Sequence, residues 1–200
     1  MLDALLVCVT AVCVVLTLSL PDASEQTYLF TNLLFLLPSA RAYTFRLLDL
    51  AVMFSALVVV SGGWHLSKTA AWRDLDSIYT RFLLFHLSLR VLPYLDVKLV
   101  YVVSLLEALL AYYFLDVWMY IHLGGVCLVA VESRLLNRYI VVAAIMMGAG
   151  WAIASLGTHR MHALWHSCAA VSLYVALYSV RDTTPRPLVT AHKLPTALRL

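Results

Sequence analysis

Residues 60–76 read VSGGWHLSKTAAWRDLD, and residues 159–166, far along the chain, read HRMHALWH. The first stretch contains His65, and the second contains His162 and His166, which are four positions apart. Positions i and i+4 share one face of a helix, so these two histidines are expected to point the same way. Three neutral imidazoles that converge suit a zinc ion that keeps an open position for water. The sequence therefore predicts that the two stretches meet at a metal site.

Ser61 and Asp76 accompany the predicted ligands. Ser61 precedes His65 by one helical turn, and Asp76 follows it on what we expect to be the next helix. Zinc lowers the pKa of a bound water to about 7, so hydroxide becomes available at neutral pH. We expect Asp76 to orient or deprotonate that water, or to hydrogen-bond a ligand histidine. Ser61 is expected to hydrogen-bond the developing oxyanion or the water. The alternative is that these polar side chains are satisfied by backbone groups or by water at a membrane interface.

The composition places the chain in a membrane. Of its 200 residues, 63% are hydrophobic and 12% are charged, and the mean hydropathy is +0.89. Soluble domains have an apolar content of about one half and a charged content of about one quarter.

The chain has the size of a single domain, and no basic cluster interleaved with aromatic residues indicates nucleic-acid binding. The four cysteines lie in apolar segments without paired spacing, which favours buried single thiols.

Long apolar runs predict an all-α fold, namely a seven-transmembrane helix bundle within residues 1–180. The expected spans are residues 2–20, 46–66, 74–94, 97–114, 116–131, 139–156 and 161–180. Residues 181–200 contain three prolines and are expected to form a polar, disordered cytoplasmic tail. Residues 27–37 are apolar but too short to cross, so we expect an interfacial or re-entrant segment. Ala144 and Gly148 form a small-xxx-small face that favours close helix packing.

The order of the spans decides whether the predicted site residues can meet. If the spans alternate in direction, the end of the second, the start of the third and the start of the seventh share one side of the membrane. These three places hold Ser61, His65, Asp76, His162 and His166. Most lysines and arginines outside the spans lie on the opposite side, which indicates a cytoplasmic C-terminus. We therefore expect a multi-pass protein of an endomembrane (ER or Golgi) or of the plasma membrane, whose site faces the lumen or exterior.

The other ionisable residues within the expected helices receive no catalytic role. His159 lies on the same helical face as His162 and could replace a ligand or shuttle protons, although a loop position is favoured. His86, Glu107 and His122 lie within other expected spans, where we expect them to hydrogen-bond between helices.

The sequences SGGWH at residues 61–65 and HALWH at residues 162–166, together with Asp76, make the chain similar to the CREST superfamily of seven-span membrane proteins. This superfamily includes alkaline ceramidases, GPI-remodelling lipases, progestin/adiponectin receptors, haemolysin-III-like proteins and a muscle fusogen. The resemblance extends over the seven-span layout, and its specific matches are these short motifs. It implies that the three histidines bind Zn2+, while Ser61 and Asp76 assist a zinc-bound water in cleaving a lipid amide or ester.

The leading function hypothesis is a zinc-dependent integral-membrane hydrolase that cleaves an amide bond of a ceramide-like lipid or an ester bond of a glycerolipid. The amide ranks first on the resemblance alone. The partners are then the lipid substrate and the bilayer. The rival hypothesis is a non-enzymatic, receptor-like or fusion-related protein with a structural zinc site. A weaker alternative is a transporter that relays protons through its histidines.

Overall fold

Our computed structural model describes residues 30–92, 95–114, 137–154 and 159–183, with a few single positions between and before these ranges. For residues 159–160 and 181–183 it describes the backbone and not the side chains. In this part of the chain every regular element is a helix, so the all-α class is confirmed. The spans expected at 2–20 and 116–131, and the tail beyond residue 183, lie outside the described ranges.

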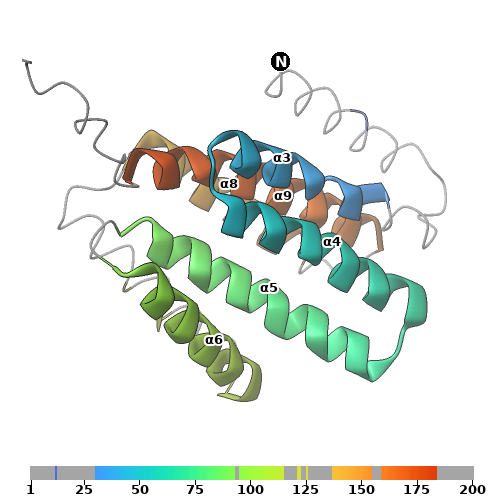
Figure 1. The fold of residues 1–200 in the computed structure, drawn as a ribbon. Helices are drawn as coiled ribbons and strands as arrows, with labels where there is room; N and C mark the ends of the chain where they lie inside the picture. Colours follow the sequence, from blue (N-terminus) through green and yellow to red (C-terminus); the bar gives the residue numbers. More distant parts are fainter. Residues whose placement is uncertain are drawn as a thin grey trace, which may run out of the picture.

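The described helices form a layered bundle (Figure 1). Their bounds are Leu36–Thr44 for α3, Leu48–Ser67 for α4, Ala70–Arg90 for α5, Val97–Phe114 for α6, Arg138–Ala154 for α8 and His159–Thr183 for α9. α9 packs against α8 and α3, α4 packs between α3 and α5, and α6 packs on the far side of α5. A short turn at Lys68 and Thr69 makes α4 and α5 antiparallel neighbours, so the end of α4 lies beside the start of α5.

Three of the described helices are long and apolar enough to cross a membrane, namely α4, α6 and the part of α9 from Met161 to Val180. α8 is apolar but has 17 residues. α5 has 21 residues, but its sequence carries Arg73, Asp74, Asp76, Arg81 and Arg90, and it is not among the candidate spans. The described residues therefore support a membrane protein with three candidate spans and do not show the seven that the apolar runs predicted.

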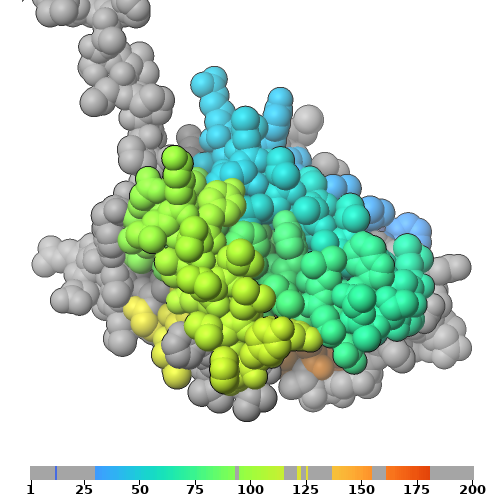
Figure 2. Space-filling model, turned by 60° about the horizontal axis from the view of Figure 1, so that its bottom comes forward, coloured from blue at the N-terminus to red at the C-terminus, as the bar shows by residue number. Residues whose placement is uncertain are grey.

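Apolar side chains cover much of the outside of the bundle. On α4, Val52, Val59 and Leu66 are each more than 60% exposed, and they recur at seven-residue spacing along one face. The surface of α6, which Figure 2 brings forward in yellow-green, carries further exposed leucines and valines. Soluble proteins rarely expose apolar patches of this extent. A surface of this kind fits a hydrocarbon surrounding better than water.

The buried core joins the first and last described parts of the chain. Leu50 and Phe54 of α4 and Leu177 of α9 are fully buried in one cluster. This cluster also takes in Leu34 and Phe35, which precede α3. α4 and α9 therefore contribute to one core even though they are far apart in the described sequence.

The segment expected to be interfacial or re-entrant is helical for most of its length. Residues 30–33 form a helical turn, and after a break at residues 34–35 the chain continues into α3. Pro38 explains the break, because it has no N–H to donate to the carbonyl of Leu34. The buried positions of the segment recur at helical spacing, namely Thr31, Asn32, Leu34, Phe35, Pro38, Ser39 and Ala42. The segment packs on α4 and α9 within the bundle.

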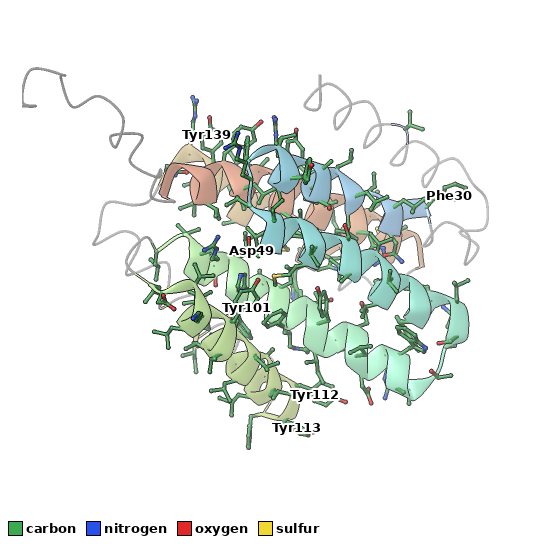
Figure 3. The ribbon with its side chains drawn as sticks, in the orientation of Figure 1. Phe30, Asp49, Tyr101, Tyr112, Tyr113 and Tyr139 are labelled. Carbon is green, nitrogen blue, oxygen red and sulfur yellow. The ribbon has the colours of Figure 1, made fainter. Side chains whose placement is uncertain are left out.

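A buried polar cluster lies near the start of α4 and the end of α5. Nη2 of Arg90 lies 3.5 Å from Oδ2 of Asp49, and Nε2 of His86 lies 3.9 Å from the same oxygen. Tyr101 of α6 also interacts with the Asp49 carboxylate, and Figure 3 shows the two residues on the helices that flank α5. These contacts tie α4, α5 and α6 together.

Gly150 lets α8 approach α9 closely. A Cβ atom at Gly150 would lie 2.7 Å from Cβ of Cys168 and 2.9 Å from the ring of Trp165. At Gly148 an added Cβ would have no atom within 4 Å. The small-residue face expected at Ala144 and Gly148 was therefore the wrong face, since both residues are exposed. The face that meets α9 contains Ala143 and Gly150, and Ser172 of α9 donates a hydrogen bond to the carbonyl of Ala143 at 2.7 Å.

We predict opposite effects for alanine at these two glycines. Gly150→Ala should lower the free energy of unfolding by about 1–3 kcal/mol, because the new methyl group overlaps α9. Gly148→Ala should leave it unchanged or raise it by about 0.5–1 kcal/mol, because alanine favours helix and meets no neighbour. Thermal unfolding of detergent-solubilised protein, followed by tryptophan fluorescence, measures both. Equal melting temperatures for the two variants would contradict the close packing at Gly150.

Candidate metal centre

Three histidines from two helices form one compact cluster. His65 comes from the last turns of α4, and His162 and His166 come from the first turns of α9. One ring nitrogen from each residue lies within 4.8 Å of the other two. The ring centroids are 5.3 Å apart between His65 and each α9 histidine, and 4.7 Å apart between His162 and His166. The structure thus brings together the three residues predicted as metal ligands.

Helix geometry explains how these side chains converge. His162 and His166 are one turn apart and share a face of α9. His65 lies near the end of α4. The helix ends at Lys68, which has a left-handed backbone conformation (φ 55°), and the Lys68 N–H donates a hydrogen bond to the carbonyl of Trp64. Because α4 ends there, the chain turns back into α5, and His65 stays at this end of the bundle. Residues of α4 and α9 belong to one apolar core. This core sets the distance between the two helices, which the side chain of His65 spans to reach the α9 histidines.

The cluster meets the main requirements of a metal centre. His65 and His166 are each 4% exposed, and His162 is partly exposed. Three imidazole nitrogens suit zinc, whose bonds to histidine are about 2.0–2.1 Å long, so that ligand nitrogens lie at most about 4.2 Å apart. The observed upper limit of 4.8 Å is close to this value. The partial exposure of His162 leaves one side of the cluster open to a small molecule.

Thr31 supports the cluster from outside. Its Oγ1 lies 3.1 Å from Nδ1 of His166, in a buried hydrogen bond between residues 135 positions apart. Metal-binding histidines commonly use their second nitrogen in such a bond, which fixes the ring and leaves the other nitrogen for the metal. Thr31 was not predicted from the sequence. Its hydroxyl lies in a mostly apolar stretch that also contains Thr27 and Asn32, so the stretch does not single it out.

Ser61 and Asp76 are also brought together. Ser61 is 3% exposed and lies on α4 one turn before His65. Its side chain interacts with the carboxylate of Asp76, which reaches it from the first half of α5. Oδ1 of Asp76 is buried and accepts no hydrogen bond from the described residues. The Asp76 carboxylate therefore interacts with Ser61 and has a second oxygen that accepts no hydrogen bond from the described residues. It lies near the end of α4 that carries His65.

Two further described histidines, His86 and His122, lie outside the cluster. His86 lies near Asp49 in the buried polar cluster of α4, α5 and α6. Nε2 of His122 lies 2.9 Å from Oγ of Ser88, and its Nδ1 lies 2.6 Å from Oε2 of Glu107. The contacts of His122 with Ser88 and Glu107 agree with the expected interhelical role, whereas His86 approaches Asp49 only to 3.9 Å. The side chain of His159 lies outside the described part of the chain.

The thiol prediction can be checked at one position. Cys168 is a free, half-buried cysteine on α9, as expected of a single thiol. The other three cysteines lie outside the described ranges.

The chain was compared with protein-family models, with curated proteins and with solved structures, and none of them matches it. The interpretation of the site therefore rests on its own residues.

We predict that Thr31→Val weakens metal binding by about tenfold or more, because the ring of His166 loses the hydrogen bond that orients it. Thr44→Val is the matched control, since the Thr44 hydroxyl bonds the carbonyl of Arg41 on the exposed side of α3. Competition with a chromogenic chelator measures the zinc affinity of each purified variant. Equal affinity in the two variants would show that Thr31 does not support the site.

Proposed function

We propose that this protein is a zinc-dependent integral-membrane hydrolase of a lipid amide or ester. The observation that carries the proposal is the convergence of His65, His162 and His166, with the paired Ser61 and Asp76 on the neighbouring turn and helix. Zinc bound by these histidines would supply an acidified water and polarise a carbonyl group. The exposed apolar surface supports a substrate drawn from the bilayer.

The protein's own residues then have distinct roles. His65, His162 and His166 hold the metal through neutral ring nitrogens, and Thr31 keeps the ring of His166 in place. The buried Oδ1 of Asp76 accepts the proton of the attacking water, and the Ser61 side chain holds the same carboxylate in position. Proton transfer by a positioned carboxylate typically accelerates such a reaction by about 10²–10⁴-fold. A purely structural metal site has no need of an acceptor placed in this way.

The membrane arrangement completes the proposal. We infer a seven-span, multi-pass bundle in which the described α4, α6 and α9 supply three of the spans. The positive-inside rule supports a cytoplasmic C-terminus, with the site facing the lumen or exterior of an endomembrane or the plasma membrane. The end of α4 and the starts of α5 and α9 meet at one end of the bundle, so the site lies near an interface, where lipid linkages and headgroups are found (Figure 1). The short motifs that resemble the CREST superfamily support the same assignment and favour an amide over an ester.

Elemental mass spectrometry of detergent-purified protein tests the metal first. We expect about one zinc per chain, and its loss in the His162→Ala/His166→Ala double variant, because two of the three protein ligands are removed. Wild-type protein prepared without chelators that contains no metal would refute the zinc-hydrolase proposal.

Substitution of Asp76 separates catalysis from metal binding. Asp76→Asn should retain zinc but lose about 10²–10⁴-fold in turnover of N-acyl lipids or glycerolipids, because the amide cannot accept the proton. Asp74→Asn is the control, since Asp74 lies two residues away and pairs with Arg73 at the surface. Mass spectrometry of released fatty acid measures both rates. Hydrolysis that is equal in Asp76→Asn and wild type would remove Asp76 from the mechanism, and a wild-type protein that binds zinc but hydrolyses no lipid would favour a structural site.

A further inference from the structure

An apolar groove runs along the outside of α4 beside the candidate metal centre. Its volume is about 430 Å³, and it is lined by Leu33, Val58, Val59, Leu66 and Trp72, with glycines of α4 between them. Leu33, Val59 and Leu66 are each at least 50% exposed. The groove therefore opens outward, on the surface that the membrane assignment places in contact with lipid.

One polar side chain interrupts this lining. Asn32 is 1% exposed, and neither its Oδ1 nor its Nδ2 hydrogen-bonds to any described residue. Burying an amide without a partner is costly, so a buried amide normally has one. The residue before it, Thr31, bonds the metal-centre residue His166, and Gly62 in the groove follows Ser61 directly. The amide of Asn32 is thus placed where the groove adjoins the candidate metal centre.

We propose that the groove binds the acyl chain of a membrane lipid and that Asn32 hydrogen-bonds the polar linkage of the same molecule. The inference rests on the proposed function, for which it supplies a substrate-binding residue. An acyl lipid matches both parts of the surface, because its chain is apolar and its linkage region offers hydrogen-bonding groups to an amide. The amide of Asn32 has N–H donors and a carbonyl acceptor. A lipid linkage that also contains donors and acceptors, such as an amide with a neighbouring hydroxyl, therefore satisfies it more fully than an isolated ester does.

Two adjacent glycines offer a way to test occupancy of the groove. A Cβ atom at Gly62 would have no described atom within 4 Å, so a larger side chain there projects into the groove. A Cβ atom at Gly63 would lie 2.5 Å from the ring of Trp72, so that position is already filled by protein. Gly62→Leu should therefore block the groove while keeping the fold, since leucine also favours helix more than glycine.

The first experiment uses a photo-crosslinking N-acyl lipid with a diazirine in its acyl chain, in detergent or nanodiscs containing the zinc-loaded protein. We expect crosslinks on the groove residues Leu33, Val59 or Leu66, and their loss in Gly62→Leu. Val52→Phe is the control for bulk added on the same exposed face of α4 away from the groove, and it should leave the crosslinks unchanged. Crosslinking elsewhere, or crosslinking of Gly62→Leu equal to wild type, would overturn the groove assignment.

The second experiment replaces Asn32 by leucine, which has a similar volume and cannot hydrogen-bond. Loss of one hydrogen bond should weaken lipid binding by about tenfold, while the melting temperature stays the same or rises because an unpartnered buried amide is removed. A lower melting temperature with unchanged lipid binding would show that Asn32 has a structural partner instead. Crosslinks in the groove without hydrolysis would support lipid binding in the groove and reject the proposed reaction. Hydrolysis without crosslinks in the groove would support the reaction and reject lipid binding in the groove.

Discussion

The surrounding structure depends on the contact between His65 on α4 and the paired histidines on α9. His65 and His166 are almost fully buried, their rings contact each other and the ring of His162, and Thr31 hydrogen-bonds Nδ1 of His166. The apolar core of Leu50, Phe54 and Leu177 fixes the spacing between the two helices. The end of α4 at Lys68 then directs the chain into α5, which brings Asp76 back toward Ser61.

Two buried polar clusters interrupt the apolar interior of this bundle, and many apolar side chains also lie on its outside. The metal-centre cluster lies where α4 ends and α9 begins, and a second cluster around Asp49 and Arg90 lies where α4 begins and α5 ends. Between them, α4 presents apolar residues both to the core and to the surroundings. In hydrocarbon, buried hydrogen bonds and ion pairs contribute to helix association, because burial of apolar surface drives it less than in water. The histidine cluster therefore joins α4 to α9, and the second cluster joins α4 to α5.

The sequence predicted those features that depend on composition and local spacing. The helix expected at residues 97–114 is α6, because a predominantly apolar run of this length favours a helix, although no Gly or Pro marks its end. The ligand set was predictable because histidine is a typical zinc ligand and His162 and His166 are one turn apart. Tertiary packing decided the rest. Both Gly148 and Gly150 are small, and only the packing shows that Gly150 faces α9. Thr31 and Asn32 carry no local pattern, so their places beside the site and in the groove could not be read from the sequence.

The hydrogen bond between Thr31 and His166 joins residues 135 positions apart. During synthesis the segment that contains Thr31 and the helix that contains His65 emerge long before α9 does. Contacts between such distant parts form late, since much of the chain must first be in place. The three-histidine cluster is therefore completed last, and a chain that has not yet packed α9 offers one histidine of the three. Metal uptake by this protein would then report that the polypeptide is complete and correctly folded in its membrane.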